Sequence, residues 1–310
     1  MARFFVTGGA GFIGSYLVPR LLEKGEVTVY DNLSSGKKEF LTPCLKDIKF
    51  IKGDLLDKKK LLKSIKGHDM VYHLAANPDI RRGITETGFD LEQGTVATFN
   101  VLDSMRITGI KDICFSSSSV VYGEAKVIPT PEDYGPLLPI SLYGASKLAC
   151  EGLITGFCGT FGMRSWIYRF ANIVGGNSTH GIIYDFMKKL GKDKKELEIL
   201  GDGMQEKSYL HAGECVDGML AGVGKARDSV NVFNLGCDDR IRITRIAEIV
   251  VEELGLKGVN FRYTGGRRGW PGDVPSMLLS TERMKSLGWR PKLSSEGAVR
   301  RAASELIGGK

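Results

Sequence analysis

Residues 6–14 of the chain read VTGGAGFIG, a glycine-rich stretch between an apolar run and an amphipathic one. Gly8, Gly11 and Gly14 are spaced three apart. Between a strand and a helix, the first glycine permits a tight turn, the second lets backbone approach a pyrophosphate, and the third allows close helix–strand packing. The helix N-terminus adds N–H donors and a partial positive charge. Glycine-rich turns also occur in ordinary loops, but this context favours a dinucleotide site.

The first 170 residues repeat this alternation of short apolar runs and amphipathic stretches. Strands are predicted over 3–7, 27–30, 48–51, 70–73, 113–116 and 165–168. Helices are predicted over 12–24, 61–65 and 95–105, and from near Ser141 to beyond Glu151. Such alternation predicts an α/β fold, a Rossmann-type doubly wound parallel sheet covered by helices.

After residue 172 the alternation becomes irregular, and predicted helices are centred near Asp185, Val216, Ile246, Glu282 and Val299. We therefore predict a dinucleotide-binding Rossmann domain over 1–172 and a smaller mixed α/β substrate-binding region over 173–310. In this arrangement the chain is free to cross between the two lobes more than once.

The composition is that of a globular protein large enough for two domains. Of its 310 residues, 42% are hydrophobic and 25% are charged. No apolar stretch approaches the ~18 residues that a membrane-spanning helix needs. The N-terminal sequence turns glycine-rich before a secretory apolar region develops. We expect neither a membrane span nor secretion.

The charges and cysteines of the chain indicate which ligands and which cellular compartment to expect. The chain carries 43 basic and 36 acidic residues, a formal charge of +7. Its lysine runs, at 58–60 and 188–195, are short and separated, which indicates solvated faces and not a nucleic-acid site. A mild positive field favours a small anion such as a nucleotide. The six cysteines form no C-x-x-C pair and no zinc spacing with the four histidines, so we predict no metal site and a reducing cytoplasm.

Two acidic residues follow predicted strands and bear on the type of dinucleotide. Asp31 comes 23 residues after Gly8, where a carboxylate accepts from ribose hydroxyls and repels a 2′-phosphate. This favours NAD over NADP, the alternative being that Asp31 and Asn32 form a plain turn. Asp54 is placed either to accept from the adenine amino group or to cap the helix that follows.

A tyrosine and a lysine four residues apart suggest proton chemistry. Tyr143 and Lys147 share one face of a predicted helix. A free phenol has a pKa of ~10, and a nearby ammonium or a positively charged nicotinamide ring favours the phenolate, which can act as a base. Y-x-x-x-K also occurs by chance, but residues 116–119 here are four serines at the carboxyl end of a predicted strand, where α/β sheets bind ligands.

Taken together, these segments resemble the extended short-chain dehydrogenases/reductases. The resemblance is to their NAD-dependent sugar-nucleotide epimerase/dehydratase family, and within it most closely to the UDP-glucose 4-epimerases. It covers nearly the whole chain. The segments that carry it are VTGGAGFIG at 6–14, DNL at 31–33, GDL at 53–55, HLAA at 73–76, FSSSSVVYG at 115–123, YGASK at 143–147, RFAN at 169–172, KSYLH at 207–211 and RGWPGD at 268–273.

The resemblance implies roles for individual residues. Ser118 bridges substrate and base, Tyr143 is the catalytic base, and Lys147 holds the nicotinamide ribose. The implied NAD contacts are Gly8, Gly11, Phe12, Ile13, Gly14, Asp31, Asn32, Asp54, Leu55, Leu74, Ala75, Ala76, Ser116, Tyr143, Lys147 and Phe170. The implied nucleotide-sugar contacts are Ser118, Tyr143, Asn172, Lys207, Arg268 and Asp273. A usual asparagine that helps to hold the cofactor is replaced here by Gly94, a change expected to weaken NAD binding.

The implied activity is a UDP-glucose/UDP-galactose 4-epimerase of galactose metabolism, a cytoplasmic homodimer whose partner is a UDP-sugar. It would oxidise the C4 hydroxyl transiently and return hydride to the opposite face. Another nucleotide-sugar epimerase and a 4,6-dehydratase are alternatives, although residues 118–120 lack the carboxylate that dehydration needs. A non-catalytic NAD sensor is a third alternative, which Gly94 keeps open and the intact Tyr143 and Lys147 oppose.

Overall fold

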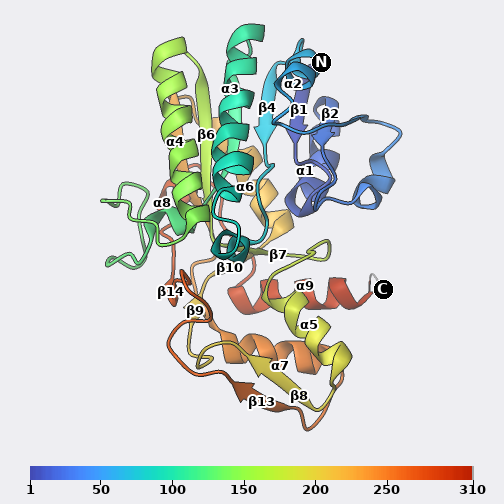
Figure 1. Ribbon diagram of the computed structural model, residues 1–310, viewed down its shortest axis with the longest axis vertical. Helices are drawn as coiled ribbons and strands as arrows, with labels where there is room; N and C mark the ends of the chain where they lie inside the picture. The colour runs from blue at the N-terminus through green and yellow to red at the C-terminus, as the bar shows by residue number, and fades with distance from the viewer. Residues whose placement is uncertain (309–310) are drawn as a thin grey trace. The chain divides into compact units, whose positions relative to one another are not determined.

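A seven-stranded sheet organises the computed structural model, which describes residues 1–308 (Figure 1). Its strand order is β11-β6-β5-β4-β1-β2-β3, and neighbouring strands from β3 to β5 pair in parallel. This contains the Rossmann order 3-2-1-4-5-6, which confirms the predicted fold class. The strands are β1 (Ala2–Thr7), β2 (Gly25–Asp31), β3 (Lys49–Lys52), β4 (Met70–His73), β5 (Asp112–Ser118), β6 (Arg164–Phe170) and β11 (Val230–Leu235).

Helices between the strands arise where apolar residues recur at helical spacing. In α2 (Lys58–Ile65), Leu61 and Ile65 are buried four residues apart, and Asp57 caps the helix by accepting from Lys60 N. The others in this part of the chain are α1 (Phe12–Leu22), α3 (Ala97–Thr108), α4 (Leu142–Phe161) and α6 (Ala212–Lys225). The helix predicted from residue 95 is present, but a π-helical turn, η3 (Leu91–Val96), precedes α3. Such turns are frequent at functional sites.

The chain forms two compact units, each built from three segments. Unit 1 comprises Met1–Val121, Leu142–Arg169 and Met219–Phe233; unit 2 comprises Tyr122–Ser141, Phe170–Gly218 and the chain from Asn234 onward. Each has its own apolar core. That of unit 1 is formed by the sheet with α2, α3 and α4, and that of unit 2 lies around three helices, α5 (Ile182–Lys192), α7 (Ile243–Glu253) and α9 (Ser295–Gly308). The predicted dinucleotide-binding region over 1–172 and the predicted substrate-binding region over 173–310 are defined by ligand binding, and they stay predictions.

Unit 2 contains short strands in small sheets and four of the five helices predicted beyond residue 172; the fifth, predicted near Val216, is α6, which begins in unit 2 and ends in unit 1. Strand β10 pairs with β7, β9 lies between β12 and β14, and β13 pairs with β8. Its elements are β7 (Asn172–Val174), α5 (Ile182–Lys192), β8 (Glu196–Ile199), β9 (Glu206–Lys207), β10 (Tyr209–His211), β12 (Ile241–Arg242), α7 (Ile243–Glu253), β13 (Asn260–Tyr263), β14 (Ser276–Met277), α8 (Glu282–Ser286) and α9 (Ser295–Gly308).

Over residues 1–308, no helix combines the length and the apolar character needed to cross a membrane. All six cysteines are buried, and none of them is in a disulfide. Within the same residues, no group of three or more His, Cys, Asp and Glu side chains is arranged to hold a metal ion.

Candidate functional site

The glycine turn after β1 is closed by neighbouring backbone. Gly8 has φ of +69°, and a Cβ there would lie 2.6 Å from Ala75 N. A Cβ at Gly14 would lie 2.5 Å from the Gly9 carbonyl oxygen, so neither glycine can be replaced without backbone movement. Helix α1 begins at Phe12 after a glycine N-cap that makes no side-chain hydrogen bond. Its first N–H groups and the bare turn form a cradle that fits a pyrophosphate. The turn carries the predicted cofactor residues Gly8 and Gly11, and the first residues of α1 are the predicted Phe12, Ile13 and Gly14.

Asp31 ends β2 beside this turn and is 7% exposed. Its two carboxylate oxygens accept from Ala10 N at 3.0 Å and from Leu33 N at 2.8 Å. Burial raises the pKa of Asp31, and these two bonds oppose that shift. Asn32 donates to the Asp54 carboxylate at 3.0 Å, so the predicted ribose and adenine residues lie together. Asp54 Oδ1 also accepts from backbone within its own turn, at 2.9 Å, whereas α2 has a different cap.

The segment after β4 packs against the same turn. Leu74 N donates to the Thr7 carbonyl at 3.1 Å, and Ala75 N donates to Thr7 Oγ1 at 3.4 Å. Ala76 follows directly, and Leu55 is buried in the core of unit 1. The structure therefore brings the predicted cofactor residues of the first four strands to the carboxyl edge of the sheet.

The serines at the end of β5 face different partners. Ser116 Oγ donates to the His73 carbonyl at 3.3 Å, and Ser117 Oγ donates to Glu151 Oε1 at 2.5 Å. Both of these serines are buried, whereas Ser118 is partly exposed. Of the three serines of β5, Ser118 is thus the one that a substrate can reach.

Tyr143 and Lys147 lie on the first turns of α4, as the i, i+4 spacing predicts. Lys147 is 5% exposed, and its ammonium donates to the Ser116 carbonyl at 2.6 Å. The same Nζ lies 4.7 Å from the centre of the Phe115 ring and 5.7 Å from the centre of the Tyr143 ring. The structure therefore joins the lysine, the tyrosine and the end of the serine strand.

Burial dominates the electrostatics of this group. It raises the pKa of Tyr143, with smaller contributions from Asp90 and Cys150 in the same direction. It lowers the pKa of Lys147 to about 8, against the opposing influence of Cys150, Glu151 and Asp90. With only the chain's own groups counted, Tyr143 is a phenol at neutral pH. Lowering its pKa requires a further positive charge, which the sequence analysis expected from an oxidised nicotinamide.

A buried ion pair that was not predicted from the sequence lies behind the serines. Arg169 donates to both carboxylate oxygens of Glu151, at 2.7 Å to Oε2 and 3.0 Å to Oε1. The two side chains are 6% and 7% exposed and join β6 to α4. The bond from Ser117 to Glu151 links β5 to the same pair. Glu151 comes one turn after Lys147, so helical spacing along one face is the signal that could have found it.

A second missed residue is Asp90, which is 2% exposed just before η3. Its Oδ1 accepts from Asn77 Nδ2 at 3.0 Å, and its backbone oxygen accepts from Ser146 Oγ at 2.7 Å. Its partners are 13 and 56 residues away, and no motif includes them.

Gly94 lies in η3 beside this residue. A Cβ at Gly94 would be 2.1 Å from Ser146 Oγ, which also lies 3.0 Å from Thr95 Oγ1. A side chain at position 94 would therefore collide with the serine of the Tyr143–Lys147 segment. The Ser146 hydroxyl therefore leaves room only for glycine at position 94. This packing accounts for Gly94 in place of the asparagine that is usual in the family.

The predicted cationic residues of unit 2 are engaged by carboxylates of the same unit. Lys207 forms an ion pair with Asp273, and its Nζ lies 5.2 Å from the centre of the Trp270 ring. Arg268 donates to the Asp273 carbonyl at 2.5 Å and to Glu124 Oε2 at 2.8 Å. Three of the predicted nucleotide-sugar residues therefore form one cluster, to which Glu124 adds an unpredicted negative charge.

The remaining predicted residues of unit 2 lie at the ends of strands. Asn172 opens β7, and its side-chain amide donates to the Ser208 carbonyl at 3.1 Å, next to Lys207. Phe170 ends β6 and is 5% exposed. Ser118, Tyr143 and Lys147 belong to unit 1, whereas Phe170, Asn172, Lys207, Arg268 and Asp273 belong to unit 2.

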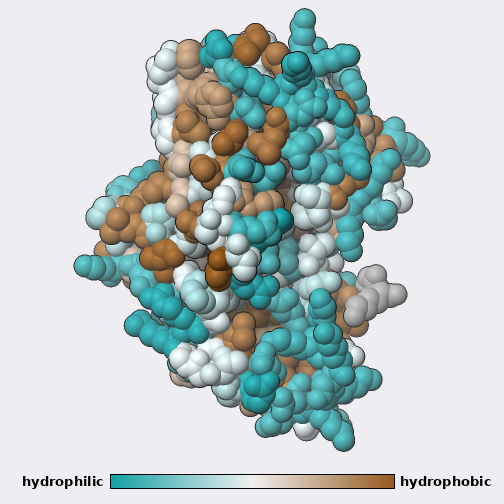
Figure 2. All heavy atoms as spheres, in the orientation of Figure 1, coloured by the Kyte–Doolittle hydropathy of each residue, from teal (hydrophilic) through white to brown (hydrophobic). Residues whose placement is uncertain are grey.

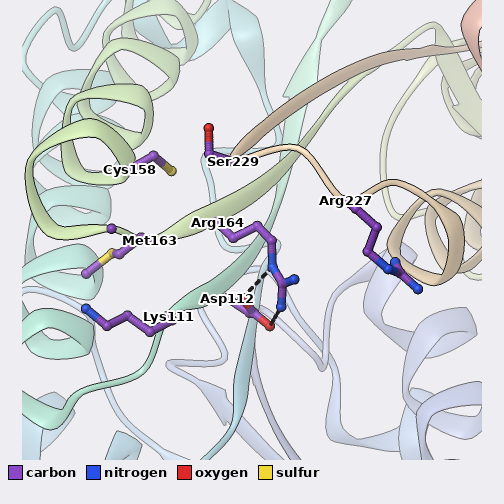
Figure 3. Close-up of a pocket in the computed structure, with 8 residues that line it drawn as sticks. Lys111, Asp112, Cys158, Met163, Arg164, Arg227 and Ser229 are labelled. Atoms are coloured by element: carbon purple, nitrogen blue, oxygen red, sulfur yellow. Dashed lines mark hydrogen bonds and ion pairs between the residues drawn. The ribbon is translucent and has the colours of Figure 1, made fainter.

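A pocket of about 370 Å³ lies at the opposite end of the strands (Figure 3). It is formed where β5 and β6 begin, and its Arg164 makes a two-pronged bond to Asp112 at 3.0 and 2.7 Å. Lys111 donates to the Phe161 carbonyl, and Arg227 donates to carbonyls at the end of α6. None of the predicted site residues lines it, and its cations already have partners.

Comparisons with known proteins agree with this geometry. Residues 4–236 match the model of the NAD dependent epimerase/dehydratase family. A putative UDP-glucose 4-epimerase of Methanocaldococcus jannaschii is 30% identical over 306 residues, 96% of each chain. A crystal structure of a UDP-galactose 4-epimerase superposes with a TM-score of 0.90 at 43% identity, covering 99% of both chains. DesIV, a dTDP-glucose 4,6-dehydratase of Streptomyces venezuelae, gives 0.90 at 26% identity, covering 99% of this chain and 97% of that one.

Proposed function

The chain belongs to the NAD-dependent epimerase/dehydratase family, and on this premise we propose that it interconverts UDP-glucose and UDP-galactose. The proposed reaction inverts C4 of the sugar through a transient 4-keto form, which makes the enzyme an isomerase. Its similarity to 4-epimerases over almost the full length supports this reaction.

The observation that carries the proposal is the arrangement of Lys147, Tyr143 and the end of β5. A buried ammonium is fixed on the Ser116 carbonyl, within 6 Å of the tyrosine ring, next to the one partly exposed serine of the strand. A phenol with a fixed cation beside it is suited to taking a proton from an alcohol and giving it back. A non-catalytic NAD sensor has no need of this arrangement.

The cofactor is NAD, and the residues of unit 1 fit it. The glycine cradle would take the pyrophosphate, and the Asp31 carboxylate would accept from the adenosine ribose. Lys147 would hold the nicotinamide ribose while its charge acts on Tyr143. When bound, the oxidised cofactor would supply the hydride acceptor for sugar C4 and the hydride donor for its return.

The proton follows a path through this chain's own atoms. Tyr143 Oη, as phenolate, accepts the proton of the C4 hydroxyl while the C4–H bond breaks and the C4=O double bond forms. Ser118 Oγ lies between substrate and base in the proposed arrangement and orients the hydroxyl. On return, Tyr143 donates the same proton to the ketone oxygen as the C4–H bond forms again, so no proton is consumed overall.

Binding of the UDP group is assigned to unit 2. Lys207 and Arg268 supply positive charge for the diphosphate, and Asn172 and Asp273 supply polar groups for the nucleotide. Arginine and lysine both bind phosphate, and arginine also has a two-pronged donor geometry. The carboxylates that engage these cations would have to exchange with the phosphates.

Product analysis by NMR tests the proposed function. UDP-glucose, UDP-galactose, UDP-N-acetylglucosamine and dTDP-glucose are incubated separately with the enzyme in D2O. We expect UDP-glucose and UDP-galactose to give one mixture of the two sugars, without deuterium at C4, because the hydrogen returns directly. Turnover of the N-acetylated sugar alone would show that UDP-N-acetylglucosamine is the substrate. A 4-keto-6-deoxy product would show that the enzyme is a dehydratase. No turnover of any of them, with NAD bound, would overturn the proposal.

A homodimer is proposed from the surface of unit 1. Large apolar side chains are exposed on α3 and α4, among them Phe99, Ile107 and Phe161 at 40%, 50% and 39%. Figure 2 shows hydrophobic residues gathered over these two helices. Exposed apolar patches mark association surfaces. The mass measured by light scattering after size exclusion should be twice the chain mass for the wild type. It should equal the chain mass for Ile107→Glu, because a charge would then lie in the interface. A monomeric wild type contradicts the proposal.

The cytoplasm is the proposed compartment, and the cysteines support it. All six thiols are buried and none is in a disulfide, as is usual in a reducing environment. Fractionation of the native host would test this proposal, and recovery of the protein outside the cell would contradict it.

A further inference from the structure

Asp90 is buried with half of its carboxylate unsatisfied. The residue is 2% exposed, and Oδ1 accepts from Asn77 Nδ2. Oδ2 is buried and has no hydrogen-bond partner. Nearly all buried polar atoms in proteins are hydrogen-bonded, so such an atom calls for an explanation. A protein that needed only packing at this position would hold an apolar side chain.

The surroundings of Asp90 connect it to the Tyr143–Lys147 segment. A Cβ at Gly83 would be 2.9 Å from Asp90 Oδ2 and 3.4 Å from Leu142 Cβ, so the carboxylate and the start of α4 flank the same glycine. Leu142 immediately precedes Tyr143. One turn further along α4, Ser146 Oγ donates to the Asp90 backbone oxygen at 2.7 Å. The backbone of Asp90 is thus bonded to the second turn of α4, and its carboxylate lies close to the residue that precedes Tyr143.

The charged and titratable groups around this position come from several elements. Arg82 of η2 (Ile80–Ile84) is already held by Glu86, at 2.7 and 2.9 Å. Those that face Asp90, Tyr143 and Lys147 are Arg82, Cys150, Glu151 and His73. Two of these groups are carboxylates, those of Glu151 and Asp90. Glu151 is bonded to the Arg169 cation, whereas the Asp90 carboxylate has no cation hydrogen-bonded to it.

We propose that Asp90 is a positioning residue for the proton transfer, whose buried negative charge balances the Lys147 ammonium and keeps Tyr143 a phenol until a second positive charge enters the site. The reaction that it serves rests on the proposed function. The electrostatic coupling to Tyr143 and Lys147 is a property of this chain alone and exists without substrate.

The charge count gives the physical reason. A buried lysine loses its proton readily, and a nearby carboxylate counters this loss. The same carboxylate disfavours a second negative charge on the tyrosine. When oxidised NAD adds one positive charge, a phenolate restores neutrality with Asp90 and Lys147 both charged. The base would therefore form when the oxidised cofactor is present and not before.

The coupling is tested without turnover by ultraviolet titration of Tyr143. The tyrosinate absorbance of wild-type protein is recorded against pH, and the signal of Tyr143→Phe is subtracted to isolate the one residue. The same pair of titrations is made in the Asp90→Asn background. We expect the Tyr143 midpoint to fall by roughly 1–2 pH units in Asp90→Asn, because a like charge has been removed. An unchanged midpoint overturns the proposal, whatever the substrate turns out to be.

The pH profile of kcat tests the same inference during turnover. Asp90→Asn should move the acidic limb, set by Tyr143, and the alkaline limb, set by Lys147, to lower pH together. Loss of a merely structural residue would reduce kcat at every pH and leave both limbs in place. Asp103→Asn is the matched control: it removes a carboxylate from α3 that is paired with Lys58 and Arg106, and its profile should match the wild type.

A second variant covers the case in which Asp90→Asn fails to fold. Asn77→Ala keeps the carboxyl group but removes the donor to its Oδ1, which makes the charged form less favourable. The titration midpoint and both limbs should move in the same direction as for Asp90→Asn, by a smaller amount. If neither variant moves them, Asp90 is not a positioning residue; if they move while no sugar is turned over, the proposed function fails and the coupling stands.

Discussion

The ion pairs of the two units differ in how much water reaches them. In unit 1, Arg169 and Glu151 are 6% and 7% exposed and joined by several hydrogen bonds. In unit 2, Arg268 and Glu124 are 39% and 44% exposed. Separating a buried pair leaves an uncompensated charge in a medium of low polarity, whereas an exposed pair is worth about 0–1 kcal/mol.

This contrast assigns different tasks to the two sets of charges. The buried charges of unit 1 cannot exchange partners easily, so they are suited to holding the fixed geometry that the proposed proton transfer needs. Arg268 can release Glu124 at small cost and accept another anion, as binding and release of a nucleotide sugar require. Lys207 is intermediate, because it is 12% exposed and partly covered by Trp270. The contrast therefore predicts that changes in unit 1 affect rate and stability, and that changes at Arg268 affect binding.

The largest effect is expected for Tyr143→Phe. The variant keeps the ring and removes the hydroxyl that we propose exchanges the proton, so kcat should fall by a factor of about 10²–10⁴. NAD content, measured after denaturing the purified protein, should stay within twofold of the wild type. Full activity in this variant would remove Tyr143 from the mechanism and with it the task assigned to unit 1.

Glu151→Ala should cost the most stability. It leaves the Arg169 guanidinium buried without its partner, which destabilises by about 3–5 kcal/mol. Urea unfolding followed by circular dichroism measures the loss. Glu196→Ala is the matched control, because its ion pair with Arg262 is exposed and its removal should cost about 0–1 kcal/mol. Equal losses in the two variants would erase the contrast between buried and exposed pairs.

Arg268→Ala should raise KM for the nucleotide sugar by roughly 10- to 100-fold, the equivalent of losing one or two charge-assisted hydrogen bonds. We expect kcat to change by less than threefold, since the reacting groups are untouched. Arg262→Ala removes another exposed arginine of unit 2 and should leave both constants unchanged. A fall in kcat with an unchanged KM would contradict the assignment of Arg268 to binding.

The smallest predicted effect concerns His73, which is fully buried between two threonine hydroxyls, at 2.7 Å from Thr7 and 2.9 Å from Thr98. Burial lowers its pKa to about 3, against ~6.5 in the unfolded chain. Between these values the unfolded state binds more protons, so stability falls by about 1.4 kcal/mol per pH unit as the pH drops below ~6.5. The loss between pH 7 and pH 5 should therefore be about 2 kcal/mol smaller in His73→Asn. An identical loss would show that the buried ring accepts a proton.

The parts of the fold that follow local patterns were predictable. The strand at Met70–His73 was predicted with its observed ends, because a strand buried on both faces has a mainly apolar sequence with no alternation. The glycine turn was found because its spacing matches a backbone requirement that the structure displays at Gly8 and Gly14. Lys147 was found because a four-residue spacing places it beside Tyr143.

What could not be predicted depends on partners far apart in the sequence. Asp90 is fixed by Ser146, 56 residues away, and Arg268 is engaged by Glu124, 144 residues away. From the sequence, Gly94 was likewise interpreted only as a lost cofactor contact. Its packing reason became visible once the position of Ser146 Oγ was known, since no pattern in the chain relates the two residues.

The alternation of the chain between its two units has a consequence for how the gene can be divided. Strand β11 lies next to β6 in the central sheet, yet it is contributed by residues 230–235. A fragment truncated at residue 172 would lack it and expose β6 as an open edge, a template for aggregation. No single cut yields both halves intact. Exchanging unit 2 between two enzymes of this family by recombination would therefore require moving its three separate segments at once.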